Sequence, residues 1–148
     1  DPAVLADQAR MLSGLVDTWL MVGLKAFVTY YYAVAARLLG AAGLVDEALA
    51  RLDAGQRLAA ETGMRFYDAE MLRVRATLQP DAALAAADRM AAIEIARAQG
   101  ATIFELRIAM DLDDQGHDGG AAALSDAMGR FPPDSAWPGL RAARAHVR

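Results

Sequence analysis

The 148-residue chain contains no cysteine, a single lysine and two histidines, and each scarcity removes a class of function. Without thiols the chain forms no disulfide and has no cysteine nucleophile or metal ligand. Zinc needs several nitrogen or sulfur ligands at set spacings, which His117 and His146 do not supply. No serine lies in a nucleophile-elbow pattern, and no Gly-rich phosphate loop precedes Lys-Ser or Lys-Thr. We therefore expect a non-catalytic segment that binds neither a metal ion nor a cofactor.

Positive charge is also scarce, because 15 Lys and Arg residues face 19 Asp and Glu residues, for a net charge of −4. Proteins that bind nucleic acid neutralise phosphates with clustered basic residues, whereas the arginines here are interleaved with acids. The longest uncharged piece of the most apolar region, residues 26–36, is too short to cross a bilayer. No basic stretch followed by an apolar core marks a signal peptide. The sequence predicts a cytoplasmic protein without direct contact to nucleic acid or membrane.

Alanine is what the chain has in excess, with 35 residues, while β-branched residues are few. Alanine has the lowest free-energy cost of entering a helix, so this composition predicts an all-α fold. The chain contains no internal linker, and we expect one continuous domain over 1–148. Its start at Asp1-Pro2, without an initiator Met, suggests a piece of a longer protein. The predicted helices span 3–19, 24–41, 45–61, 64–77, 81–99, 102–114, 119–130 and 137–147.

Several predicted helix ends have local reasons. Gly40 and Gly43 are expected to end the second helix, since glycine accepts the left-handed conformation of a helix C-terminus. Pro80 lacks an amide hydrogen and fits the first turn of the fifth helix. Thr102 and Glu105 have the spacing of a capping box, in which the two side chains satisfy unpaired amides at a helix start.

Three glycines, Gly23, Gly63 and Gly100, each separate two amphipathic runs, and each precedes a cluster of aromatic or bulky apolar residues. Repeats of this length in a helical chain are typical of stacked helix pairs, in which no single pair can bury its apolar face alone. We expect three repeats and a C-terminal capping helix, which makes an α-solenoid. The predicted repeats cover approximately 24–62, 64–99 and 102–131, and the capping helix covers 137–147.

The acidic cluster at 111–118 suggests a metal site at first sight. A calcium loop that starts at Asp111 needs a bidentate carboxylate at its twelfth position, which is Ala122 here. Polar clusters with glycine between periodic segments are typical of loops. We expect a solvated turn between the sixth and seventh helices.

Polar and aromatic residues recur on the first helix of each repeat, where they would face a concave groove. Glu70 and Arg73 can pair on one helix face, so a solvated face with intrahelical ion pairs is the alternative. The consecutive tyrosines 30–32 cannot share a face, because successive helix residues point about 100° apart; we expect one or two of them in the core. The predicted groove residues are Tyr30, Arg37, Tyr67, Glu70, Arg73, Thr77, Arg107 and Met110.

Residues 46–52, 61–75 and 92–107 resemble the C-terminal tetratricopeptide-repeat region of large bacterial signal-transduction ATPases. Those proteins also carry an adenylate- or guanylate-cyclase-type domain or a DNA-binding domain. The resemblance implies a tetratricopeptide-like right-handed superhelix that acts as a sensor or protein-interaction module. Its partner would be a protein or peptide, including the ATPase domain of the same chain, whose output domain it would regulate.

Two alternatives stay open. A small-molecule inducer could bind between helices, with Phe66, Tyr67 and Phe104 as walls of the pocket. Homodimerisation through the ends of the repeat array is the other, with Trp19 or Trp137 uncovered there.

Overall fold

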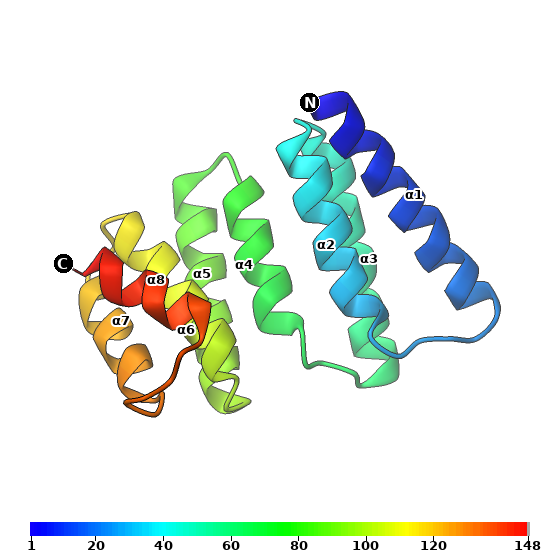
Figure 1. Cartoon of the computed structure of the whole chain (residues 1–148). Coiled ribbons are helices and arrows are strands. Elements are labelled where there is room, and N and C mark those ends of the chain that lie inside the picture. The colour runs from blue at the N-terminus through cyan, green and yellow to red at the C-terminus, as the bar shows by residue number, and fades with distance from the viewer. Residues whose placement is uncertain (148) are drawn as a thin grey trace.

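In the computed structural model, which describes residues 1–147, the chain is all-helical and these residues contain no strand, so the all-α prediction is confirmed (Figure 1). None of the helices among them combines the length and apolar character needed to cross a bilayer. The helices are α1 (Pro2–Met21), α2 (Val28–Ala41), α3 (Val45–Thr62), α4 (Asp68–Leu78), α5 (Ala82–Ala98), α6 (Thr102–Asp114), α7 (Gly120–Gly129) and α8 (Pro138–His146).

Each helix contacts only helices close to it along the chain. Consecutive helices pack together, and the even-numbered helices α2, α4, α6 and α8 also contact one another in that order. The two termini consequently lie at opposite ends of the molecule (Figure 1). The connections α1–α2, α3–α4 and α5–α6 lie along one edge of the molecule, the lower edge in Figure 1. Segments from different helix pairs are therefore neighbours along this edge.

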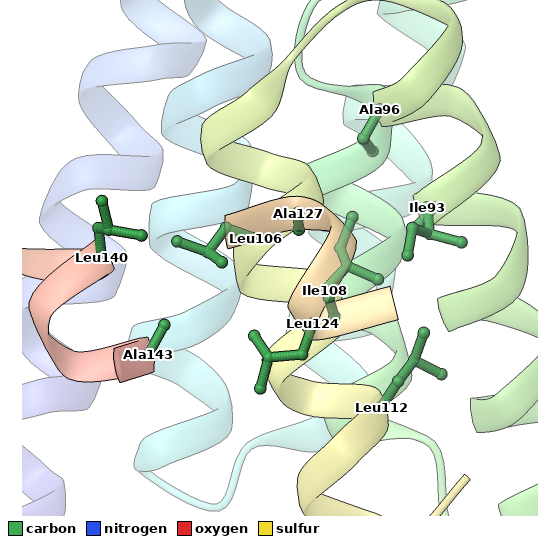
Figure 2. Packing of buried hydrophobic residues seen from close by; sticks show 12 residues of the cluster. Ile93, Ala96, Leu106, Ile108, Leu112, Leu124, Ala127, Leu140 and Ala143 are labelled. Atoms are coloured by element: carbon green, nitrogen blue, oxygen red, sulfur yellow. The ribbon is translucent and has the colours of Figure 1, made fainter. Parts of the chain in front are cut away.

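The core consists of three clusters of buried side chains rather than one centre. The largest joins α5, α6, α7 and α8, and Figure 2 shows the side chains that these helices contribute. The inner face of α8 contributes Leu140 and Ala143 to this cluster, and neither side chain has any exposed surface. Trp137 stacks on Phe131 with ring centroids 5.6 Å apart, and Trp19 packs edge-on against Tyr31. Both tryptophans are half-buried, so neither is the uncovered side chain that the dimer alternative expected.

The second and fourth helices begin later than their sequence pattern predicts. Residues 24–27 form a turn in which Phe27 takes a left-handed conformation with φ 59°, and a helix does not propagate through a positive φ. In the next repeat the amide of Arg65 donates a hydrogen bond to the carbonyl of Gly63, and the amide of Asp68 donates one to the carbonyl of Arg65. These turns delay the helix starts to Val28 and Asp68.

The capping box predicted at Thr102 and Glu105 is absent. Ala101 is the N-cap of α6 and makes no side-chain capping bond, while Thr102 is already inside the helix. Glu105 is instead buried, with 2% of its surface exposed. Its carboxylate forms ion pairs with Arg97 Nε and Arg130 Nε, each at 3.0 Å. The prediction was wrong because two arginines from neighbouring helices compete for this carboxylate.

Two other boundary residues also have different roles from those predicted. Asp81 rather than Pro80 starts α5, since its carboxylate accepts the amides of Ala83 and Leu84 at 2.8 and 3.2 Å. Gly40 lies within α2, where a Cβ would collide with Leu78 of α4, whereas Gly43 takes the left-handed conformation that the sequence predicts. Gly40 therefore lies at the contact between α2 and α4, where a larger residue would displace the end of the Leu78 side chain, rather than at a helix end.

We expect Gly120→Ala to lower the free energy of unfolding by about 2–3 kcal/mol, because the new methyl would lie 2.8 Å from backbone atoms of Asp113. Gly14→Ala is the matched control, since a Cβ at this position in α1 meets no atom within 4 Å. The free energy of unfolding of that variant should rise by about 0.5–1 kcal/mol, because alanine loses less conformational entropy than glycine in a helix. Guanidinium denaturation of both variants measures the difference. A Gly120→Ala protein as stable as the wild type would contradict the tight approach of α7 to α6.

Candidate functional site

A row of aromatic rings crosses the even-numbered helices. Tyr67, the N-cap of α4, contacts Tyr30 of α2 and Phe104 of α6, with ring centroids 5.3 and 5.8 Å apart. Tyr30 also contacts Tyr31 at 5.2 Å, and Tyr31 contacts Trp19 of α1 at 5.0 Å. These edge-on and tilted arrangements are the favourable geometries for aromatic pairs. The row links three consecutive helix pairs along one side of the molecule.

A cavity of about 490 Å³ opens at one end of this row, between the α3–α4 and α5–α6 connections. Phe66, Tyr67 and Phe104 form its aromatic walls, and Arg65 and Gln99 add polar groups. The Gln99 side chain donates a hydrogen bond to the Arg65 carbonyl at 2.8 Å, which ties the two connections together. The three residues predicted as walls of a pocket therefore line the same cavity. We call it the aromatic cavity.

The edge around the aromatic cavity exposes large apolar side chains. Phe27 is 61% exposed, Phe66 56% and Ile103 44%. The three connections at this edge, residues 22–27, 63–67 and 99–101, contain two basic residues, Lys25 and Arg65, and no acid. Arg65 lies 3.6 Å from the carboxylate of Asp68, the first residue of α4, whereas Lys25 has no ion-pair partner among residues 1–147. The edge is therefore apolar, with Lys25 as its uncompensated positive charge.

Four charged residues form a network between α4 and α6. Arg73 donates to both carboxylate oxygens of Glu70 at 2.8 and 3.0 Å and to Asp111 at 2.9 Å. Arg107 lies 3.6 Å from the same Glu70 carboxylate. Burial of the Arg73 guanidinium opposes its charged form, but the hydrogen bonds and charges of Glu70 and Asp111 outweigh this and raise its pKa above the usual value. The network holds α4 and α6 in one register.

A smaller cavity, of about 290 Å³, lies beside this network. Four of the eight predicted groove residues line it together, namely Arg37, Arg73, Arg107 and Met110. Glu70 joins them through its ion pairs, and Tyr30 and Tyr67 belong to the neighbouring aromatic row. Among residues 1–147 no carboxylate lies within ion-pair distance of the exposed Arg37.

Thr77 is the one predicted groove residue that the structure places elsewhere. It lines a third cavity, of about 480 Å³, together with Gln79, Arg89, Gln115 and His117. Its hydroxyl donates to the carbonyl of Val74 at 2.7 Å. The helical pattern grouped Thr77 with Glu70 and Arg73 on α4. Thr77 lies at the end of that helix, however, where it is exposed and lines this cavity beside the turn into α5.

The acidic cluster contains contacts that the sequence does not indicate. His146 of α8 lies 2.9 Å from Asp113 and 3.5 Å from Asp114, because α8 folds back onto the end of α6. No spacing rule links residues so far apart, and only the packing of α8 brings them together. In the part of the chain that the structure describes, no three His, Asp or Glu side chains converge as they would around a metal ion.

No family model, no curated protein and no solved structure matches the chain. The function is therefore inferred from the geometry of these cavities and from the sequence.

We expect Asp68→Asn to stabilise the protein at pH 7. Burial raises the pKa of Asp68 despite the opposing charge of Arg65, and its Oδ1 is buried without a hydrogen-bond partner. The folded state thus holds this proton to higher pH than the unfolded chain, whose carboxyl titrates near 3.8. Stability falls as pH rises through this interval, so the penalty is present at pH 7 and absent below the unfolded value.

Urea denaturation at pH 7 and pH 3 measures this effect. The advantage of Asp68→Asn over the wild type should be present at pH 7 and vanish at pH 3. Asp126→Asn, at an exposed position on α7, is the matched control and should change stability little at either pH. An advantage of the same size at both pH values would show that ionisation of Asp68 is not its cause.

Proposed function

We propose that this chain is a tetratricopeptide-like α-solenoid that binds an extended, acidic segment of a partner protein. The confinement of contacts to helices close in sequence supports the solenoid, because each helix pair then covers only the next. Such an arrangement leaves one continuous face made by the even-numbered helices. The proposed site lies on this face, between the aromatic row and the edge that carries the aromatic cavity.

The aromatic cavity is the observation that carries the proposal. Its volume lies within the range of about 300–1,000 Å³ that is usual for ligand pockets, and its walls are mostly aromatic. Phe66 is exposed beside it and offers apolar surface that water covers poorly. A large apolar side chain of the partner would enter the cavity and displace this water. Buried aromatic contacts of this kind contribute most of the binding energy in many interfaces.

The charges around the cavity define the rest of the partner segment. Lys25 and Arg65 lie in the connections at this edge, and Arg37 and Arg107 lie further along the same face. The carboxylates Glu70 and Asp111 are held by Arg73, and Asp114, which also lines the smaller cavity, lies 3.5 Å from His146. Aspartate and glutamate residues beside the apolar anchor would therefore be attracted to this face. The partner segment is acidic with at least one aromatic or large aliphatic residue.

The sequence resemblance suggests what the module regulates. In this proposal the bound segment belongs to the ATPase domain of the same polypeptide or to a protein that controls it. Binding would favour one of two arrangements of the ATPase, to the extent that the module holds one arrangement more tightly than the other. The module itself carries out no reaction, and a cyclase or a DNA-binding domain would deliver the output.

Selection from a phage-displayed library of random peptides tests the binding function. We expect the enriched peptides to combine Asp or Glu with an aromatic or large aliphatic residue. Phe66→Ala and Arg65→Glu should each weaken the selected peptides about tenfold, a loss of about 1.4 kcal/mol. Fluorescence anisotropy of labelled peptides measures these affinities.

Leu84→Ala is the matched control, because Leu84 is 54% exposed on α5, away from the aromatic cavity. It should leave peptide affinity unchanged. Peptides that bind Phe66→Ala as tightly as the wild type would refute the proposed site. If no peptide is enriched and a metabolite raises the Tm of the wild type but not of Phe66→Ala, the cavity holds a small-molecule effector instead.

The size of the native polypeptide tests the regulatory part of the proposal. An antibody raised against this domain should detect a band on the order of 100 kDa in cells that express the native gene, as expected for several domains of about 100–200 residues joined to a larger ATPase. A band near 15.7 kDa would contradict regulation in cis. The peptide-binding function would then have to act on a separate protein.

A further inference from the structure

The third cavity, which contains Thr77, lies at the opposite edge of the molecule from the aromatic cavity. It is formed where the α4–α5 connection approaches the end of α6, the upper edge in Figure 1. Its polar lining consists of Thr77, Gln79, Arg89, Gln115 and His117, and its remaining walls are mostly alanine. No Asp or Glu is among the lining residues. The cavity therefore combines one fixed positive charge with neutral polar groups and small side chains.

Arg89 differs from the other partly buried arginines of this region. Arg73, Arg75 and Arg97 each donate to a carboxylate, at distances near 3 Å. Arg89 has no carboxylate within ion-pair distance in residues 1–147, and its Nε is buried without any hydrogen-bond partner. A guanidinium stays charged at every physiological pH, and a buried N–H without an acceptor is unfavourable. An acceptor with negative charge is what this side chain lacks.

The groups around Arg89 are neutral, and two of them supply amide donors. His117 Nδ1 lies 2.9 Å from the carbonyl oxygen of Asp118, and since a carbonyl only accepts, this nitrogen carries the hydrogen; in the neutral ring Nε2 is then an acceptor and does not donate to an anion. The amides of Gln79 and Gln115 each supply two N–H groups. The nearby carboxylate of Asp81 is already engaged by two backbone amides of α5, so it does not neutralise Arg89.

We propose that this cavity binds the oxyanion of a small metabolite, a phosphate monoester or a carboxylate, with Arg89 as its charge partner. The planar guanidinium donates two parallel hydrogen bonds to either group. Gln79 and Gln115 flank the cavity and donate to the remaining oxygens. The volume of about 480 Å³ accommodates a metabolite rather than only an ion. This site is separate from the proposed peptide site and does not depend on it.

Nuclear magnetic resonance of the arginine Nε–Hε groups tests this assignment on the whole chain. Inorganic phosphate and succinate are titrated separately at constant ionic strength, which sodium chloride maintains. The Arg89 signal, identified by its loss in Arg89→Lys, should shift and saturate with at least one of the two anions. The anion that saturates at the lower concentration identifies the preferred oxyanion. The signal of Arg141, an exposed arginine of α8, should not saturate.

Variants with the same change of charge provide the control. Arg89→Gln should abolish the rise of Tm that the preferred anion produces, whereas Arg141→Gln should retain it. Circular dichroism checks that both variants fold. If the Arg89 signal does not saturate with either anion, or if sodium chloride alone reproduces its shift, water satisfies the guanidinium and the cavity is not an oxyanion site. Equal saturation at Arg141 would overturn the proposal as well.

Discussion

Burial of carboxylates between helices is the constraint on which the arrangement of this protein depends. Glu70, Asp88 and Glu105 are all buried, and each is held by an arginine. Helix surfaces rich in alanine can pack in several registers at similar buried area. A carboxylate separated from its arginine in the interior would cost several kcal/mol, so each pair that joins two helices excludes the alternative registers. The pair of Asp88 with Arg75 joins α4 to α5, and that of Glu105 with Arg97 joins α5 to α6.

The fixed register determines where the aromatic rings meet. Tyr30, Tyr67 and Phe104 come from three successive helix pairs, and their contacts require that α2, α4 and α6 keep constant offsets. The network of Arg73 with Glu70 and Asp111 provides this offset between α4 and α6. It also pairs the carboxylates of Glu70 and Asp111 on this face with arginine. In the proposed function, the ion pairs that order the helices also reduce the negative charge that an acidic partner would meet on this face.

The two proposed sites lie at opposite edges because of the alternation of the chain. Connections that lead into the even-numbered helices gather at one edge, and connections that leave them gather at the other (Figure 1). The first group carries bulky apolar residues such as Phe66, which leave the aromatic cavity between them. The second group contains Pro80 and lies beside the alanines at the start of α5, which leave room around Arg89. The chemistry of each site thus follows from the composition of one set of connections.

The sequence by itself determined the helical content and most of the helix ends, because alanine content, proline and left-handed glycine act through local backbone energetics. It also predicted Phe66, Tyr67 and Phe104 as walls of one pocket, and all three line the aromatic cavity. Only the tertiary structure decided the partners of charged side chains. Glu105 has the spacing of a helix cap, yet Arg97 and Arg130 bind it. Thr77 matches the groove pattern, yet it lines a different cavity together with Arg89. Ion pairs and cavities depend on distances between helices, and these distances arise from packing rather than from local sequence.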